Sequence, residues 1–436
     1  MVLRSRCLVL WLSSVVTVAF GCGTSTRSED QPTHPLPVGP PDGGGVVGEG
    51  GPLPDGALAP GSGIEHILST GQSNAVGFAA TPPLSNTQTF GNLMFDHGVM
   101  TSADCDKDGC KRYEKPTAFA PLVEGDTYFA DKVETMSSGI ANEISKLRGT
   151  PGNGNEGMMQ VTDAKALASA AGVKYAVRAV TAIHGESDHY GGQFPLDRTD
   201  GAPGTITNYA QALLEWQRDY DASIRAITGQ TEPVPLFISQ MANWNDTLHS
   251  EIPLRQLEAH VSAPGKVVVI GPTYQLPYAG DCIHFTNDGE RQLGEYFGKA
   301  YQRVLSGGIW EPVRPKSVTA AGNVLTVRFQ VPKPPLVLDT TLVTDPGSFG
   351  FEVADGAGAA LAITKVELAG PDAVTITLAG AIATGARLRY AYTAQPQTCP
   401  GPTTGPRGNL RDSDTSPSNG NYALYNWAVQ FDSAVE

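Results

Sequence analysis

Apolar residues gather in short runs between residues 63 and 272, and these runs alternate with stretches of helical periodicity. The runs are mostly β-branched or apolar and are bounded by turn residues, which predicts strands at 64–70, 175–183, 235–241 and 266–272. The helical stretches span residues 138–147, 162–171, 208–228 and 287–305. Because strands alternate with helices, we expect an α/β domain with a parallel sheet between two helical layers.

After residue 310 the helical periodicity stops and apolar residues alternate with polar ones. In the segment 323–331, Leu325, Val327 and Phe329 fall on one face of a strand while Thr326 and Arg328 fall on the other. Similar segments follow at 361–368, 373–378 and 387–392. This pattern predicts a small antiparallel β-sandwich. Residues 398–417 are predicted to form a loop, and residues 422–431 are predicted to form a strand that returns to the sandwich.

The first 62 residues have the composition of a targeting segment and a tether. Arg4 and Arg6 precede an apolar stretch that is too short to span a membrane, and the segment ends at Gly21-Cys22. It resembles a bacterial lipoprotein signal in which Cys22 is lipidated; ordinary secretion is the alternative. We therefore expect a lipoprotein signal peptide at 1–21, a Pro/Gly-rich linker at 22–62, an enzyme domain at 63–308 and a sandwich with a C-terminal tail at 309–436.

Cysteine usage agrees with export, and the lipoprotein-like signal predicts a place in the cell envelope, at the outer membrane or cell surface. The formal net charge of −14 argues against a nucleic-acid partner. Once Cys7 is removed and Cys22 is lipidated, four of the six cysteines remain: Cys105, Cys110, Cys282 and Cys399. An even number in an oxidising compartment favours two disulfides. We favour Cys105–Cys110 with Cys282–Cys399, among three connectivities.

One segment resembles the start of a calcium-binding loop. Asp104, Asp106 and Asp108 alternate before Gly109, but the twelfth position is Lys115 rather than glutamate. Cys105, within this run, and Cys110, directly after it, offer a competing explanation, a local disulfide. The chain has neither a zinc-type cysteine–histidine cluster nor a phosphate-binding Gly-rich loop, so we predict no metal and no cofactor.

Three polar blocks follow strands or precede a helix, where ligands bind in α/β proteins. Gly71-Gln-Ser-Asn74 follows the first strand and offers Ser73 as a nucleophile, although such a sequence is commonly a turn. Asp281-x-x-His284 offers a base with its own carboxylate, although the pair also suits a structural hydrogen bond. The block from His184 to His189 ends a buried strand and suits a ligand pocket or a polar surface turn.

Together, in this order, the three blocks resemble those of the SGNH hydrolase superfamily, and within it the sialate O-acetylesterases and carbohydrate acetylesterases. The resemblance covers roughly residues 64–305. It implies a three-layer, flavodoxin-like domain in which Ser73 is the nucleophile, His284 the general base and Asp281 its orienting carboxylate. It also implies oxyanion-hole or substrate-binding roles for Gln72, Asn74, Gly139, His184 and Glu186.

The chain departs from the family pattern at His184, where the acetylesterases usually have glutamine. The imidazole could donate to the oxyanion, with Glu186 orienting it, or His184 could bind substrate instead. We expect a monomeric esterase that removes O-acetyl groups from carbohydrate, either sialic acid or a polysaccharide. The alternatives are an esterase for other small acyl esters and a non-catalytic, glycan-binding lipoprotein.

Overall fold

The structure is a computed structural model, and it describes residues 63–96, 115–125, 127–128, 131–149, 158–192, 194–198 and 204–436. The predicted signal peptide, Cys22, the linker, the Cys105–Cys110 pair and the Asp104, Asp106 and Asp108 candidates lie outside these residues.

The α/β domain is built on a parallel four-stranded sheet, as predicted. The order is β1-β6-β9-β10, with β1 at Ile64–Gly71, β6 at Tyr175–Ile183, β9 at Leu236–Gln240 and β10 at Val267–Pro272. Six α-helices accompany it in the described residues: α1 (Met136–Arg148), α2 (Met158–Ala170), α3 (Glu186–Gly191), α4 (Tyr209–Thr228), α5 (Ile252–Ser262) and α6 (Asn287–Leu305). The sequence pattern predicted four of these helices and missed α3 and α5.

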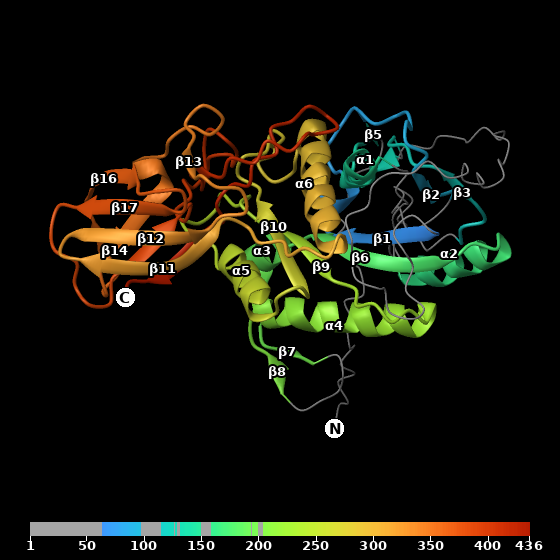
Figure 1. Ribbon diagram of the computed structural model, residues 1–436, viewed down its shortest axis with the longest axis horizontal. Coiled ribbons are helices and arrows are strands. Elements are labelled where there is room, and N and C mark those ends of the chain that lie inside the picture. The colour runs from blue at the N-terminus through green and yellow to red at the C-terminus, as the bar shows by residue number, and fades with distance from the viewer. Residues whose placement is uncertain are drawn as a thin grey trace, which may run out of the picture.

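Alternate side chains of the central strands enter two separate cores. In β9, Leu236 and Ile238 join a cluster with Leu213 and Ile224 of α4, whereas Phe237 joins one with Ile140 of α1 and residues of α6. The strand period of two therefore places α1 and α6 on one face of the sheet and α4 on the other. Figure 1 shows the resulting three layers.

The C-terminal part is an antiparallel sandwich. One sheet has the order β11-β12-β17-β16, with the strands at Arg314–Ala321, Val324–Gln330, Ala373–Leu378 and Ile363–Leu368. The other has the order β15-β14-β18-β20, with the strands at Ala360–Leu361, Phe351–Ala354, Arg387–Tyr390 and Phe431–Ala434. Leu325 and Ile376 of the first sheet and Leu388 of the second share one buried cluster, so the predicted sandwich is confirmed.

The described residues also contain four short two-stranded pairs and two 3-10 helices. Two-stranded pairs are formed by β2 (Leu93–Phe95) with β3 (Phe119–Pro121), β4 (Thr127–Tyr128) with β5 (Asp131–Lys132), β7 (Leu196–Asp197) with β8 (Thr205–Ile206), and β13 (Val337–Leu338) with β19 (Leu410–Arg411). Two 3-10 helices lie at Ser73–Val76 (η1) and Ser348–Gly350 (η2).

The returning strand predicted at 422–431 was placed too early in the chain. The strand is β20, at Phe431–Ala434, where it pairs with β18. Residues 423–425 instead run along α6, where the Tyr296 hydroxyl lies within hydrogen-bond distance of the carbonyls of Ala423 and Tyr425. Bonds to helix side chains thus replace ladder bonds in this segment.

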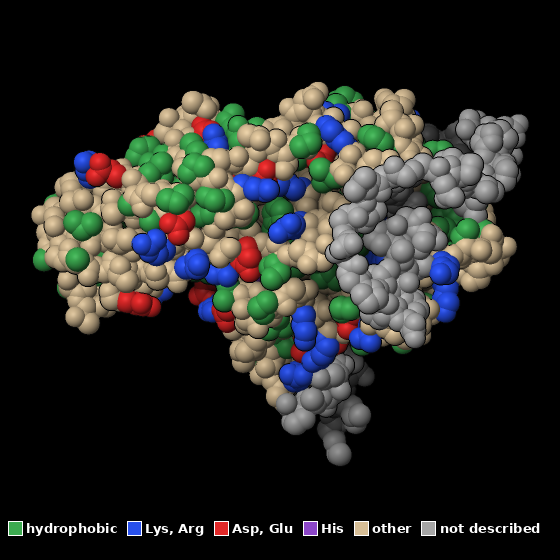
Figure 2. Space-filling model, viewed as in Figure 1, with side chains coloured by type: hydrophobic (Ala, Val, Ile, Leu, Met, Phe, Trp, Pro, Cys, Tyr) green, Lys and Arg blue, Asp and Glu red, His purple; other side chains and the backbone are tan. Residues whose placement is uncertain are grey.

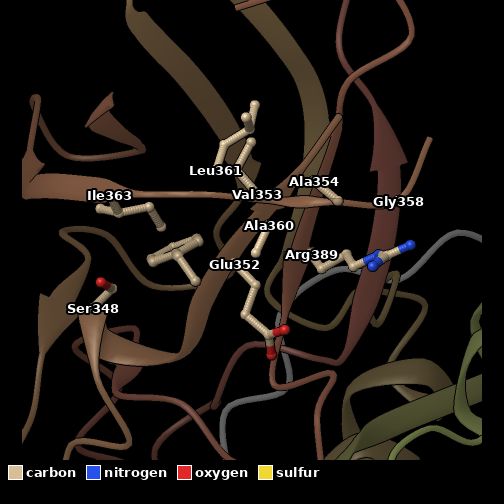
Figure 3. Close-up of a pocket in the computed structure, with 10 residues that line it drawn as sticks. Ser348, Glu352, Val353, Ala354, Gly358, Ala360, Leu361, Ile363 and Arg389 are labelled. Atoms are coloured by element: carbon tan, nitrogen blue, oxygen red, sulfur yellow. The ribbon is translucent and has the colours of Figure 1, made fainter. Parts of the chain in front are cut away.

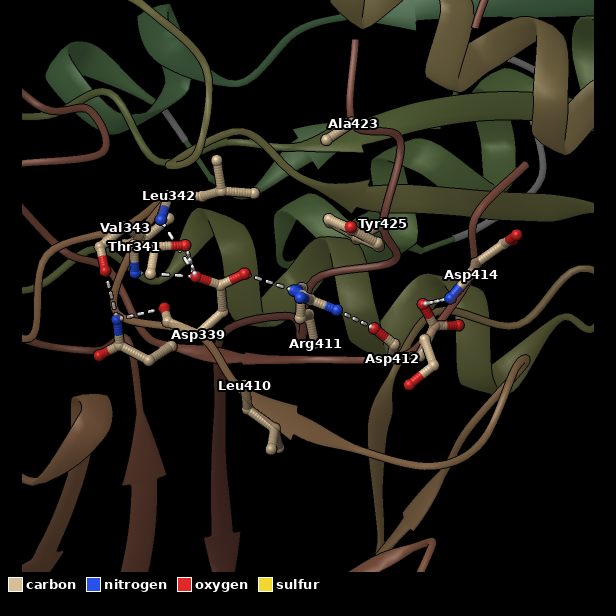
Figure 4. Close-up of polar contacts among 12 residues, drawn as sticks. Asp339, Thr341, Leu342, Val343, Leu410, Arg411, Asp412, Asp414, Ala423 and Tyr425 are labelled. Carbon is tan, nitrogen blue, oxygen red and sulfur yellow. Dashed lines mark hydrogen bonds and ion pairs between the residues drawn. The ribbon is translucent and has the colours of Figure 1, made fainter. Parts of the chain in front are cut away.

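The segment 411–426, which we call the tail strap, joins the sandwich to α6. At its start, Arg411 donates to Asp339 over 2.7 Å and its guanidinium lies 3.6 Å from the Tyr425 ring centre (Figure 4). Further along, the buried Lys299 ammonium of α6 lies 2.9 Å from Asp414 and 2.9 Å from the Asn426 side-chain oxygen. The strap therefore buries a cation of the α/β domain against a carboxylate and an amide oxygen of the C-terminal part.

A disulfide joins the two parts a second time. Cys282 pairs with Cys399, 117 residues later, as the favoured connectivity predicted. Cys282 lies between Asp281 and His284, so the bond ties the loop bearing these residues to the segment that follows β18.

None of the helices in the described part of the chain has the length and hydrophobicity that a bilayer crossing requires. On the face seen in Figure 2, basic and acidic side chains are interspersed among uncharged ones.

Candidate active site

The candidate nucleophile follows β1 through a turn that requires glycine. Gly71 has φ +146°, and a Cβ atom there would lie 2.2 Å from the carbonyl oxygen of Ile183 on β6. The chain then enters η1, whose first residue is Ser73. The close approach of β1 to β6 therefore places Ser73 at the carboxyl end of the sheet, where open α/β proteins bind ligands.

Ser73, His284 and Asp281 form one hydrogen-bonded chain. The Ser73 hydroxyl lies 2.6 Å from His284 Nε2, and His284 Nδ1 lies 2.6 Å from the Asp281 carboxylate. The other Asp281 oxygen accepts from the amides of Ile283 and His284 at 3.1 and 3.0 Å. Phe78 packs its ring 4.3 Å from that of His284. These contacts fix the imidazole between a hydroxyl and a carboxylate, as general-base activation of a serine requires.

The pKa of Asp281 favours an ionised carboxylate. Burial raises this pKa, but the hydrogen bonds from the His284 side chain and from the two amides outweigh that effect and lower it to about 2. At neutral pH the carboxylate is therefore negative, and its charge stabilises the imidazolium that forms when His284 takes a proton.

Asn74 and Glu186 belong to a buried network beneath the three residues. The amides of Asn74 and Asn243 both donate to Glu186 Oε1, at 2.9 and 3.0 Å, and both donate to the carbonyl of Ile283. Asn74 also accepts from the Phe285 amide. The network therefore links the residue after Ser73 to the loop that bears His284, and Asn74 acts here as a positioning group.

Asn243 is a site residue that the sequence analysis missed. It follows β9, at the same edge of the sheet as Ser73 and His184. A buried polar side chain after a buried strand was the available signal.

His184 is held differently from our expectation. Its Nδ1 lies 2.8 Å from the Tyr209 hydroxyl and 3.4 Å from Asp188, whereas the Glu186 carboxylate bonds the two asparagines instead. Its Nε2 lies 3.3 Å from the Gln72 side-chain nitrogen. Burial lowers the pKa of His184, against the raising effect of Asp188 and Glu186, which favours a neutral ring.

Gly139 lies inside α1, at its contact with α6. A Cβ atom at this position would lie 2.4 Å from the carbonyl oxygen of Arg291 and 3.0 Å from the Cα of Gly294. The close packing of two helices accounts for this glycine, and we leave it out of the oxyanion hole proposed below.

Three glutamates, Glu124, Glu134 and Glu290, form an acidic cluster near the start of α1. Glu124 accepts from the Ser138 amide at 2.9 Å, and Glu134 accepts from the amides of Leu84 and Ser85. Glu290 is fully buried, and both of its oxygens are without a partner in the described residues. Burial, together with the other two acids and Glu186, raises its pKa well above the usual range. We therefore expect Glu290 to be protonated and neutral.

The raised pKa values make stability depend on pH. Burial and Glu134 raise the pKa of Glu124 to about 8, and burial and Glu295 raise that of Glu143 to about 7, from an ordinary value of 4.5. Such groups stabilise the fold fully below pH ~4.5, and this contribution is lost progressively as pH rises from ~4.5 through the folded-state pKa values of about 7 and 8. We expect the melting temperature of Glu124→Gln to fall less steeply over this window than that of the wild type. Equal slopes in calorimetric scans would contradict the assignment.

The disulfide beside His284 gives a further prediction. It closes a long loop, so replacing Cys282 and Cys399 by serine should lower the free energy of unfolding by about 2–4 kcal/mol. Because Cys282 lies within the Asp281–His284 loop, the reactivity of Ser73 in the still-folded protein should also fall. Urea unfolding and the rate at which a fluorophosphonate modifies Ser73 measure the two effects, and a variant that matches the wild type in both would contradict this role.

A hollow of about 240 Å³ lies in the sandwich, away from Ser73 (Figure 3). Val353, Ala360 and Leu361 line it, with Glu352 and Arg389 at its margin. Both charged groups are already engaged, Glu352 by Thr393 and Arg389 by Asp432. We assign it no ligand. The described residues also contain no group of three or more His, Cys, Asp or Glu side chains placed to hold a metal ion.

Comparison with solved structures supports the fold assignment. The chain is similar to a carbohydrate acetylesterase from Xanthomonas citri, with a TM-score of 0.50 and 15% identity over 85% of this chain and 80% of the other. A weaker similarity, with a TM-score of 0.34 and 16% identity, links 55% of the chain to 98% of a protein from Arabidopsis thaliana. No family model and no curated protein sequence matches the chain. The chain thus shares with the Xanthomonas citri structure its fold, a parallel α/β domain followed by an antiparallel C-terminal part.

Proposed function

We propose that this protein is a serine esterase that removes O-acetyl groups from carbohydrate, either sialic acid or a polysaccharide. The observation that supports this most directly is the hydrogen-bonded chain from Ser73 through His284 to Asp281 at the carboxyl end of the sheet. The similarity to a carbohydrate acetylesterase over most of both chains supports the choice of substrate class.

The proposed reaction has two steps. Ser73 Oγ attacks the acetyl carbonyl while His284 Nε2 takes its proton, and the resulting imidazolium is stabilised by Asp281. The tetrahedral intermediate then collapses: the ester bond breaks, and His284 gives its proton to the departing sugar oxygen. A water molecule, deprotonated by His284, attacks the acetyl-Ser73 ester; the bond between the acyl carbon and Ser73 Oγ breaks, His284 returns the proton to Oγ, and acetate leaves. The Ser73 amide is the proposed backbone donor to the oxyanion.

The test is acetate release from a panel of acetylated xylans, pectins and sialosides, with p-nitrophenyl esters of increasing chain length alongside. An acetylesterase should lose activity steeply beyond the butyrate ester. Uniform activity up to long acyl chains would favour an esterase for other small esters. Failure of a fluorophosphonate to label Ser73, together with no turnover, would favour a non-catalytic glycan-binding protein.

We also propose that the protein is exported and anchored to the cell envelope through a lipid on Cys22, and that it acts as a monomer. The apolar stretch that ends at Gly21-Cys22 supports the anchor. Mass spectrometry of the mature N-terminal peptide tests it: a lipid-modified Cys22 is expected, and an unmodified N-terminus at another residue would overturn the proposal.

A further inference from the structure

The side chains of Gln72 and His184 contact each other at the open edge of the candidate site. The Gln72 side-chain nitrogen lies 3.3 Å from His184 Nε2, while the Gln72 oxygen accepts from the Ser187 backbone amide at 3.1 Å. Because a backbone amide can only donate, this second bond identifies the Gln72 oxygen and directs its NH₂ group toward the imidazole. Neither side chain is fully buried, so both are partly accessible to solvent.

The contacts on the opposite side of the ring indicate where the imidazole proton lies. Asp188 lies 3.4 Å from Nδ1, and the Tyr209 hydroxyl lies 2.8 Å from the same nitrogen. A carboxylate beside Nδ1 favours a proton on that atom, and the lowered pKa of His184 favours the neutral ring. Nε2 then has a free lone pair, which accepts one of the two Gln72 N–H groups. In this arrangement His184 Nε2 has no proton to donate to an oxyanion.

We infer that Gln72 is the side-chain donor to the acyl oxyanion and that His184 is a positioning residue which holds the Gln72 amide. This inference rests on the proposed esterase function. One N–H of Gln72 is bound by His184, and the second remains for the substrate carbonyl next to Ser73. The Ser187 amide fixes the other end of the carboxamide, so the donor is oriented before substrate arrives. His184, which stands where the acetylesterases usually have glutamine, thus accepts a hydrogen bond from Gln72 and does not donate one to the oxyanion.

The test is a double-mutant cycle on kcat for p-nitrophenyl acetate. Gln72→Glu keeps the shape but cannot donate, and it should lower kcat by about 10²–10³-fold with little change in KM. His184→Leu should cause a loss of similar size. The double variant Gln72→Glu/His184→Leu should be within about threefold of Gln72→Glu alone, because the two residues act as one unit. His184→Gln should stay within about tenfold of the wild type, since its side-chain oxygen accepts the Gln72 N–H.

Two outcomes would overturn the inference. Losses that multiply in the double variant would make His184 an independent donor, and an unchanged kcat in Gln72→Glu would exclude Gln72 as the donor. Melting temperatures and the rescue by His184→Gln separate these effects from misfolding. A wild-type protein with no turnover and an unlabelled Ser73 would instead refute the proposed function itself.

Discussion

Replacing Ser73 by alanine is expected to lower kcat for acetyl esters by about 10⁴–10⁶-fold. The hydroxyl that His284 contacts at 2.6 Å is the only nucleophile that this arrangement activates, so its removal eliminates the acyl-enzyme route. His284→Ala should give a loss of similar size, and the two losses should not add, because either change disables the same step. Initial rates with p-nitrophenyl acetate and intact-protein mass after fluorophosphonate treatment measure the effect.

Ser317→Ala is the matched control, since Ser317 lies on β11 in the sandwich. It should keep the wild-type rate and the fluorophosphonate adduct. If Ser73→Ala hydrolysed p-nitrophenyl acetate as fast as the control, the assignment of the nucleophile would be wrong.

The second large effect concerns stability. Lys299→Met should lower the free energy of unfolding by about 3–5 kcal/mol, because it leaves buried carboxylates without their cation. In the folded protein the Lys299 ammonium contacts Asp414 and Asn426 of the tail strap, and the Lys299 and Asp414 side chains are each only 7% exposed. Methionine keeps most of the side-chain volume, so the loss reports the charge rather than a cavity. Equilibrium unfolding in urea gives the number.

The matched control is Lys365→Met, which removes a lysine that pairs with Glu367 on the surface and is 61% exposed. Exposed pairs contribute about 0–1 kcal/mol, so this variant should unfold almost as the wild type does. Equal destabilisation of the two variants would show that the buried contact of Lys299 stabilises the fold no more than an exposed ion pair does.

The sequence predicted those features that depend on local pattern. The four strands of the parallel sheet and the helix at 287–305 follow from periodicity and turn residues, and all are present. The ordered polar blocks around Ser73, Asp281 and His284 predict a nucleophile, an orienting carboxylate and a base. The structure brings these three side chains together.

The remaining features depend on contacts between distant residues. Asn243 reaches Glu186 and Ile283 only because β9 ends at the same edge of the sheet as β6. The partner of His184 could not be read from residue spacing either, since Gln72 is 112 positions away. The late position of β20 has the same origin: side chains of α6 engage the carbonyls that a strand at 422–430 would have used.

The tail strap and the Cys282–Cys399 bond have a consequence for the modularity of this chain. Although the two sheets of the sandwich share a buried cluster, the α/β domain depends on residues beyond 390 for the carboxylate that pairs with Lys299 and for the disulfide that anchors its histidine loop. A fragment that ended after α6 would retain Ser73, Asp281 and His284 but would expose an unpaired buried lysine and release the loop. The sandwich therefore cannot be exchanged for another domain without loss of these contacts. Transplanting either part onto another protein would require redesign of the interface that the tail strap and the Cys282–Cys399 bond form.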